Sequence, residues 1–472
     1  MAAKILIILL SLVVTVAHAE VALVEGVQKV TKDLNDPKIF NVKTCPTYID
    51  SVTEYLFRQP ADHFVPKTPQ DIQYFKNHGI EILKSIFAVR VRLHDVLDSF
   101  ANSGELSKEC VLKIREGIQY ARFTEEYVLE WLMHEKVYSF TEAPILAGEE
   151  PFVLRNPKFS EVKLQAGDVM LIRGKSYVSA MIARIGDEEG NFSHAAIVAQ
   201  DEKGALYVVE ALIQYGVVVT PLEQWRKTQD ARVALYRFRD PAIAIAAAKA
   251  AYPWGLQHLD YDFAMDDSDY SKAFCSEVVK YAYDKGSNGK VILPAYRSTV
   301  SKFKGGDYPK SLGVTSSTLF APYDIEVDPR FEFVAEGKYY PLLRQVRMQD
   351  AVLQSVYGWM IDKNYTFYPN ASITAQVYIG KFLRYLGFFK DQFPTYMPIE
   401  TMKSVFMFEK VADPLEENLY KKEDEYYKAK NYLPSFLEMM QANDKYREQD
   451  LERYKQGESP KFHKIFRPSN VQ

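Results

Sequence analysis

The chain has 472 residues, of which 58 are lysine or arginine and 62 are aspartate or glutamate, giving a formal net charge of −4. Proteins that bind nucleic acid neutralise phosphates with a basic surface, so this balance argues against a nucleic-acid partner. Hydrophobic residues make up 47% of the chain, which is ordinary globular composition, and the length allows roughly two or three domains.

The N-terminus has the pattern of a secretory signal peptide. Lys4 precedes an apolar run, and the small-residue motif Ala17-His18-Ala19 follows it. The run is too short to span a bilayer. We therefore predict a cleaved signal peptide at residues 1–19, and a periplasmic or secreted protein without a transmembrane segment. An uncleaved membrane anchor is the alternative.

The next region, residues 20–150, is predicted to be helical. Between Thr68 and Lys136, apolar residues recur at intervals of three and four, interrupted by the turn sequence NSGEL. This spacing predicts two long helices packed as an antiparallel hairpin. Prolines and a glycine then break the periodicity in TEAPILAGEEPFVLRNP, and we place a domain boundary there.

The middle region, residues 151–340, has the character of a sheet. Five short runs rich in β-branched and aromatic residues are bounded by turn residues and predict an antiparallel sheet: GDVMLIRG (167–174), HAAIVAQ (194–200), ALYVVEALI (205–213), GVVVTPL (216–222) and RVALYRF (232–238). Two helices follow, PAIAIAAAKAAY and CSEVVKYAYDK. From Lys290 to Pro341 we expect irregular structure, and helical periodicity returns in residues 341–472.

The chain contains three cysteines, and export changes how they are interpreted. In an oxidising compartment two of the three can pair. Cys45 and Cys110 both lie in the N-terminal third, so they are the expected disulfide, and Cys275 is left as the odd thiol. The alternative is that all three thiols are free and buried.

Cys275 stands where a helix is expected to begin. The polar stretch DDSDYSKAF precedes it, an apolar helical stripe follows it, and Ser276 and Glu277 place acceptors in the first turn. A helix N-terminus favours an anion, so a thiol at this position can ionise more readily than a free cysteine. The residue is therefore a candidate nucleophile.

His194 and Glu210 are the candidate base and orienting residue. His194 opens one predicted strand, and Glu210 ends the apolar run of the next. The tight turn DEKG makes these strands neighbours, so the carboxylate could reach the imidazole and fix its tautomer. A carboxylate in an apolar run also needs a partner, whether or not that partner is catalytic.

These residues, taken in order, resemble a known family. The succession GDVMLIRGKSYVSAMIARIGDEEGNFSHAAIV, VVEALIQYGVVVTPLEQW and YDFAMDDSDYSKAFCSEVV is similar to the circularly permuted papain-like amidases, and more narrowly to the YiiX/YebB-like branch of NlpC-type cysteine hydrolases. In this group the histidine strand precedes the cysteine helix. The resemblance covers about Leu164 to Lys285. It implies an α+β fold, with a permuted papain-like core and an antiparallel sheet. The resemblance does not cover the N-terminal helical hairpin or the C-terminal helical region, which we expect to flank this core.

By position, the resemblance implies Cys275 as the nucleophile, His194 as general base and acid, and Glu210 as the orienting residue. Further matching positions that could support the site or shape its pocket are Asp168, Ser193, Tyr261, Asp262 and Ser276. No cofactor is implied. The eight histidines show no H-x-x-x-H spacing, and the cysteines show no C-x-x-C spacing, so no metal site is expected.

Three hypotheses about function follow. The first is an exported thiol hydrolase that cleaves an amide bond in peptidoglycan stem peptides or a related peptide. The second keeps the thiol chemistry but directs it at a lipid, as an acyl hydrolase or acyltransferase. The third is a non-catalytic cell-wall-binding or scaffold protein, which the competent residues at all three triad positions disfavour.

Overall fold

The computed structural model describes residues 22–137, 145–147, 150–154, 162–187, 190–228, 230–300, 308–314, 316–385 and 396–471. The predicted signal peptide, residues 1–19, lies outside the described residues. Within them, no helix is both long enough and apolar enough to cross a membrane.

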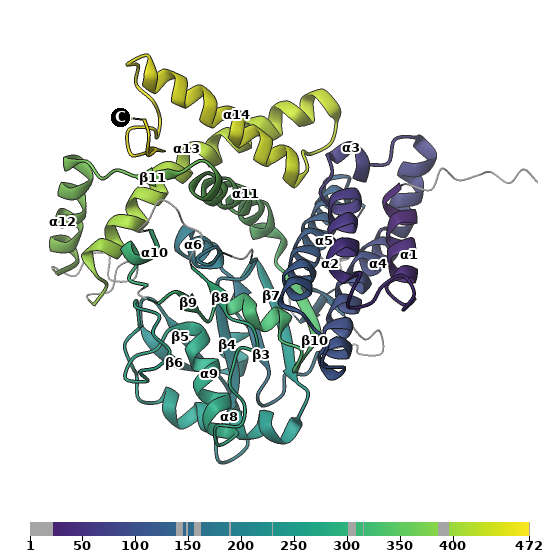
Figure 1. Cartoon of the computed structure of the whole chain (residues 1–472), viewed down its shortest axis with the longest axis vertical. Coiled ribbons are helices and arrows are strands. Elements are labelled where there is room, and N and C mark those ends of the chain that lie inside the picture. The colour runs from purple at the N-terminus through teal and green to yellow at the C-terminus, as the bar shows by residue number, and fades with distance from the viewer. Residues whose placement is uncertain are drawn as a thin grey trace, which may run out of the picture.

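The N-terminal helices pack together at one side of the molecule (Figure 1). They are α1 (Ala22–Asp33), α2 (Cys45–Val52), the short π-helix η1 (Thr53–Phe57), α3 (Ala61–Phe64), α4 (Pro69–Asn102) and α5 (Lys108–His134). The predicted helical hairpin is confirmed as α4 and α5, which pack against each other. Thr68 begins α4 with a capping box, because its side chain accepts from the Asp71 N–H and the Asp71 carboxylate accepts from the Thr68 N–H.

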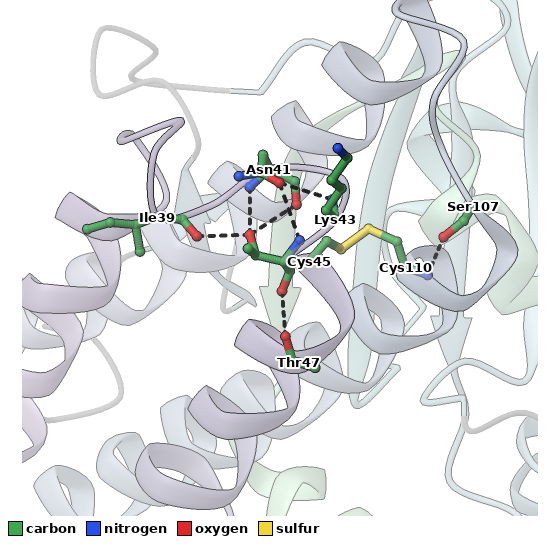
Figure 2. The surroundings of a disulfide bond; sticks show 8 residues. Ile39, Asn41, Lys43, Cys45, Thr47, Ser107 and Cys110 are labelled. Atoms are coloured by element: carbon green, nitrogen blue, oxygen red, sulfur yellow. Dashed lines mark hydrogen bonds between the residues drawn. A yellow bond between two sulfur atoms is a disulfide. The ribbon is translucent and has the colours of Figure 1, made fainter.

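A disulfide joins Cys45, the first residue of α2, to Cys110 in the first turn of α5 (Figure 2). The Ser107 side chain caps α5 by accepting a hydrogen bond from the Cys110 N–H at 3.2 Å. Cys275 is the free cysteine, and it is buried.

The central sheet has eight strands in the order β1-β2-β10-β7-β3-β4-β5-β6, and every neighbouring pair is antiparallel. The strands are β1 (Ile145–Ala147), β2 (Glu150–Leu154), β3 (Val169–Arg173), β4 (His194–Gln200), β5 (Leu206–Leu212), β6 (Gly216–Pro221), β7 (Arg232–Phe238) and β10 (Phe331–Lys338). The five predicted runs are confirmed as β3 to β7. The prediction of irregular structure was wrong for residues 331–338, because β10 lies there between β7 and β2.

Two helices of this region cover one face of the sheet. Helices α8 (Pro241–Gly255) and α9 (Cys275–Gly286) pack against each other and against β4 and β5. Alternate strand residues such as Ala195 and Ile197 face this layer, in the main core, whereas Ala196 and Val198 belong to a smaller cluster on the opposite face. The mixed helix and antiparallel sheet is the predicted α+β architecture.

The remaining elements of this region are short. They are α6 (Tyr177–Ala183), α7 (Leu222–Trp225), β8 (Ser298–Thr299), α10 (Tyr308–Ser311), β9 (Thr318–Leu319) and the 3-10 helix η2 (Pro322–Val327). The chain then enters a C-terminal helical region across one end of the molecule (Figure 1). Its elements are α11 (Tyr340–Asp362), β11 (Tyr365–Phe367), α12 (Ala371–Tyr385), α13 (Ile399–Lys430), α14 (Phe436–Lys455) and β12 (Phe466–Pro468).

A buried ionic cluster connects the helical hairpin to the sheet. Glu336 of β10, which is fully buried, accepts hydrogen bonds from Arg90 of α4, from Arg122 of α5 and from Lys338. Arg122 also pairs with Glu326. Buried charges require partners of opposite sign, so these residues fix the helices α4 and α5 to β10.

A second set of charges extends this cluster to the C-terminal helices. Arg232 of β7 donates to Glu126 of α5 and, at 2.7 Å, to Asp350 of α11. Arg173 of β3 donates to the same Asp350 at 3.1 Å. One continuous cluster of buried charges therefore connects the N-terminal helices, the sheet and the C-terminal helices.

Candidate active site

Cys275 is the first residue of α9, with Phe274 at the N-cap position. The first N–H groups of a helix have no intrahelical partner, and together with the helix dipole they favour a negative charge. The residue is only 2% exposed, so its sulfur is desolvated by the surrounding core. The predicted helix start is therefore confirmed.

His194 and Glu210 lie on the same face of adjacent strands. In the register of β4 and β5, Ala196 is opposite Glu210, so His194 is the diagonal neighbour of Glu210 two residues along. His194 Nε2 lies 2.7 Å from Glu210 Oε2. This contact leaves the other ring nitrogen, Nδ1, for the thiol.

His194 and Cys275 also interact with each other, and the interaction shifts the pKa of both side chains. Burial alone would lower the pKa of His194, but the interactions with Cys275 and Glu210 outweigh it and raise the pKa from 6.5 to about 10. Burial would raise the pKa of the Cys275 thiol, but the interaction with His194 shifts that pKa below its ordinary value of 9.0. Between these two pKa values the pair is a thiolate and an imidazolium.

Two further groups stabilise the thiolate. One is the backbone N–H of Ala195, the residue after His194. The Ser276 Oγ lies 3.9 Å from the Cys275 Sγ. Both groups lower the pKa of the Cys275 thiol, so β4, which carries His194, also helps to stabilise the thiolate form of Cys275.

The three side chains open into one cavity of about 890 Å³, within the size range of small-molecule sites. Cys275, His194 and Glu210 line it together with Tyr261 and Ser193. Most of the remaining wall is apolar. It comes from the ends of β3 and β5, from α6 and α7, and from the C-terminal helices α12 and α13.

Tyr261 and Ser193 are placed beside the triad by backbone contacts. Tyr261 forms a parallel bridge with Ala273, just before the nucleophile, and Ser193 donates from its N–H to the Ile172 carbonyl at 2.9 Å. Gly216, with φ of 71°, lets Leu259 approach closely, since a Cβ there would lie 2.1 Å from the Leu259 oxygen. The chain before Tyr261 is thereby fixed against β6.

Asp262 and Asp168 do not line the cavity. The Asp262 carboxylate accepts from the backbone N–H groups of Ala264 and Asp266, and so shapes the loop before α9. Asp168 accepts two hydrogen bonds from Arg237, at 2.8 and 2.9 Å. Both residues hold backbone or strand positions and lie outside the cavity that the triad opens into.

Sequence reasoning missed several residues of the cavity. Asp230, which precedes β7, lines it, and burial raises the pKa of its carboxyl to about 6, although the nearby His194 charge opposes that shift. One indication of this role was present in the sequence, because Asp230 lies shortly before the predicted strand RVALYRF. The wall residues of α12 and α13 gave no such signal, because the spacing of apolar residues in these helices does not indicate which surface they pack against.

Among the described residues, no group of three or more histidine, cysteine, aspartate or glutamate side chains could hold a metal ion.

Residues 163–321 match the model of the family described as permuted papain-like amidase enzyme, YaeF/YiiX, C92 family. Among solved structures, the chain is similar to the metalloprotein yiiX from Escherichia coli O157:H7 (DUF1105). That similarity has 20% sequence identity and a TM-score of 0.29, and it covers 37% of this chain and 97% of that chain. A search of curated proteins found no match.

Proposed function

We propose that this protein is a cysteine hydrolase acting on an amide bond, because residues 163–321 match the model of the permuted papain-like amidases of the YaeF/YiiX, C92 family. Cys275 is the nucleophile, His194 the general base and acid, and Glu210 the residue that orients the imidazole. The observation that carries this proposal is that Cys275, His194 and Glu210 line one cavity, with His194 Nε2 2.7 Å from the Glu210 carboxylate.

The proposed reaction starts from the Cys275 thiolate and the His194 imidazolium of the resting enzyme. The Cys275 thiolate attacks the substrate carbonyl carbon, and a C–S bond forms while the negative charge moves to the oxygen. First-turn N–H groups of α9 are positioned to stabilise that oxyanion, an effect worth about 10²–10³ in rate. The His194 imidazolium gives its proton to the leaving nitrogen as the C–N bond breaks.

The resulting thioester is then hydrolysed. Neutral His194 takes a proton from water, the hydroxide adds to the thioester carbonyl, and the C–S bond breaks to release a carboxylic acid and the thiolate. Glu210, 2.7 Å from Nε2, stabilises the imidazolium whenever it forms. No other reactant is needed for this cycle.

We place the enzyme outside the cytoplasm, in line with the predicted signal peptide at residues 1–19 and with the Cys45–Cys110 disulfide. Peptidoglycan stem peptides are the amides that an exported enzyme would meet there. A lipid substrate is the second candidate, and the apolar lining of the cavity favours it.

The test is product analysis by mass spectrometry with muropeptides and with fatty-acyl amides. Wild-type protein should release an amine and an acid from one of these substrates, and the Cys275→Ala variant should release neither. A thioester adduct on Cys275, trapped at short times, would identify the acyl half of the substrate. Turnover by Cys275→Ala at the wild-type rate would remove the nucleophile assignment.

A further inference from the structure

Asp230 is a charged residue of the cavity that the proposed reaction does not use. It lies two residues before β7 and lines the cavity together with Cys275 and His194. The sheet places it at the same end as the histidine, because Ile172 of β3 is paired with His194 on one side and with Val233 of β7 on the other. One strand, β3, therefore separates Asp230 from the strand that carries the general base.

This separation suits a substrate that reaches both residues. Strands β7, β3 and β4 lie side by side in the sheet (Figure 1). Neighbouring strands are about 4.8 Å apart, so β4 and β7 are about 10 Å apart across β3. A substrate whose carbonyl lies at Cys275 can therefore place a group that is several bonds away from that carbonyl at Asp230.

The Asp230 carboxylate lacks a cationic partner. Its side chain is partly buried and accepts a hydrogen bond from Thr228 Oγ1 at 3.4 Å. Among the described residues, no lysine or arginine forms an ion pair with it, and Lys175, whose charge acts on it, is exposed. Although burial raises the pKa of the Asp230 carboxyl to about 6, the group is ionised at neutral pH. An ionised carboxylate without a counter-ion is costly to bury, and a cation that enters the cavity would offset that cost.

The rest of the cavity offers no positive charge to a bound anion. The described residues that line it include no lysine or arginine, and its acidic residues are Glu210, Asp230 and Glu409. The imidazolium of His194 is balanced by the Cys275 thiolate, so the lining is negative overall. A cleft lined by charge of one sign attracts ligands of the opposite sign and rejects those of the same sign.

We propose that Asp230 determines the specificity of this cavity for a substrate with a positively charged amine several bonds from its scissile carbonyl, and that the carboxylate binds this ammonium group. The inference rests on the proposed function, because it names the chemistry of the substrate for the same site. Glu210 is engaged with His194 at 2.7 Å, which leaves Asp230 as the carboxylate that can meet the substrate at this end of the sheet. A substrate with a carboxylate or a phosphate at the same position is rejected.

Charge selection can be measured without a substrate, from the rates at which small reagents modify Cys275. The probes are alkyl methanethiosulfonates of matched chain length that end in an ammonium, a hydroxyl or a sulfonate group. In each reaction the Cys275 thiolate attacks the thiosulfonate sulfur, a disulfide forms and methanesulfinate leaves. The rates are read by mass spectrometry of the full chain with its Cys45–Cys110 disulfide intact. Each rate is divided by the rate of the same reagent with a free thiol in solution.

The assay is run above the Asp230 pKa of about 6, where the carboxylate is ionised. The wild type should then favour the ammonium reagent over the hydroxyl reagent by at least about fivefold, since a charge pair in contact contributes that much even in water. Asp230→Asn should remove most of this preference, and Asp230→Glu, which keeps the charge, should retain it. The ratio of rates isolates the effect on the ligand, because an effect of Asp230 on the thiolate changes all three rates alike. The matched control is Glu202→Gln, which removes an exposed carboxylate from the turn between β4 and β5 and should react as the wild type does.

Four results would overturn the inference. Equal normalised rates for the ammonium and hydroxyl reagents in the wild type would mean that the cavity does not select a cation. An equal change with all three reagents in Asp230→Asn would show that Asp230 acts on the thiolate and imidazolium instead of on the ligand. A loss of preference in Glu409→Gln as large as that in Asp230→Asn would assign the selection to the net charge of the cavity. A thiol that reacts after unfolding but with none of the reagents in the native protein would remove both the inference and the proposed nucleophile.

The outcomes also separate this inference from the proposed function. Equal rates in a protein that cleaves amides through Cys275 would remove the inference alone. A cation preference that depends on Asp230, in a protein that cleaves no amide, would sustain the charge selection and remove the proposed chemistry.

Discussion

Removing the charge of Glu210 is the sharpest perturbation of the proposed site. Glu210→Gln keeps the shape of the side chain and can still accept a hydrogen bond from His194 Nε2, now 2.7 Å from a carboxylate oxygen. What it removes is the negative charge that stabilises the imidazolium. Cys275 remains as the second stabilising group.

The size of the effect follows from the hydrogen bond that is weakened. A hydrogen bond to a charged group contributes about 1.5–3 kcal/mol, and one pKa unit corresponds to about 1.4 kcal/mol. The pKa of His194 should therefore fall by about 1–2 units from its value of about 10. It should stay above the ordinary 6.5, because the thiolate still favours the imidazolium.

The assay is an NMR titration of the protein with isotope-labelled histidine, in which a His194→Ala sample identifies the His194 signal. The pKa of His194 is read in wild type, in Glu210→Gln and in a control, Glu223→Gln, whose exposed carboxylate lies on α7. The control should titrate as the wild type does.

Two results would refute this reasoning. A wild-type His194 pKa near 6.5 would mean that no thiolate–imidazolium pair exists in the resting protein. A pKa that is the same in wild type and in Glu210→Gln would mean that the carboxylate does not stabilise the imidazolium, and Glu210 would lose its role as the orienting residue.

Three other predictions concern stability. The Cys45–Cys110 disulfide closes a segment with a sequence separation of 65, so the double serine variant should lower the free energy of unfolding by about 2–4 kcal/mol in a denaturant titration; no change would mean that the unfolded N-terminal region is already constrained. Glu336→Gln should cost about 3–5 kcal/mol, because buried cations lose their shared carboxylate, and a loss below 1 kcal/mol would contradict the cluster. Burial raises the pKa of the Glu277 carboxyl from 4.5 to about 9, so its contribution to stability is present below pH 4.5 and is lost as the pH rises towards 9. In the Glu277→Gln variant, the free energy of unfolding should fall less steeply over this range, by up to about 1.4 kcal/mol per pH unit. The same pH dependence in variant and wild type would show that Glu277 is ionised.

The parts of the site that sequence could predict are those with local signals. The alternation in β4 and β5, with the tight turn between them, places His194 and Glu210 on neighbouring strands. A polar turn before an apolar helical stripe places Cys275 at a helix start. Each signal acts within a few residues, and that is why all three predicted placements agree with the structure.

The parts that could not be predicted depend on distant partners. Strand β10 carries Glu332 and Glu336, and acidic residues weaken a strand pattern. Glu336 is compatible with a buried strand because Arg90 and Arg122 reach it from helices more than two hundred residues earlier. The cavity wall could not be predicted for a similar reason. The apolar residues of α12 indicate that one face of the helix is buried, but the elements that this face meets are distant in the sequence.

The same ionic cluster decides when the chain can finish folding during its synthesis. Arg90 and Arg122 leave the ribosome long before Glu336, with sequence separations of 246 and 214. Until β10 exists, Arg90 can pair with Glu125 of α5, but both guanidinium groups lack the Glu336 carboxylate, and the hairpin cannot close on the sheet. Contacts of such range slow folding, so the N-terminal helices cannot reach their final packing against the sheet until the last third of the chain has been made.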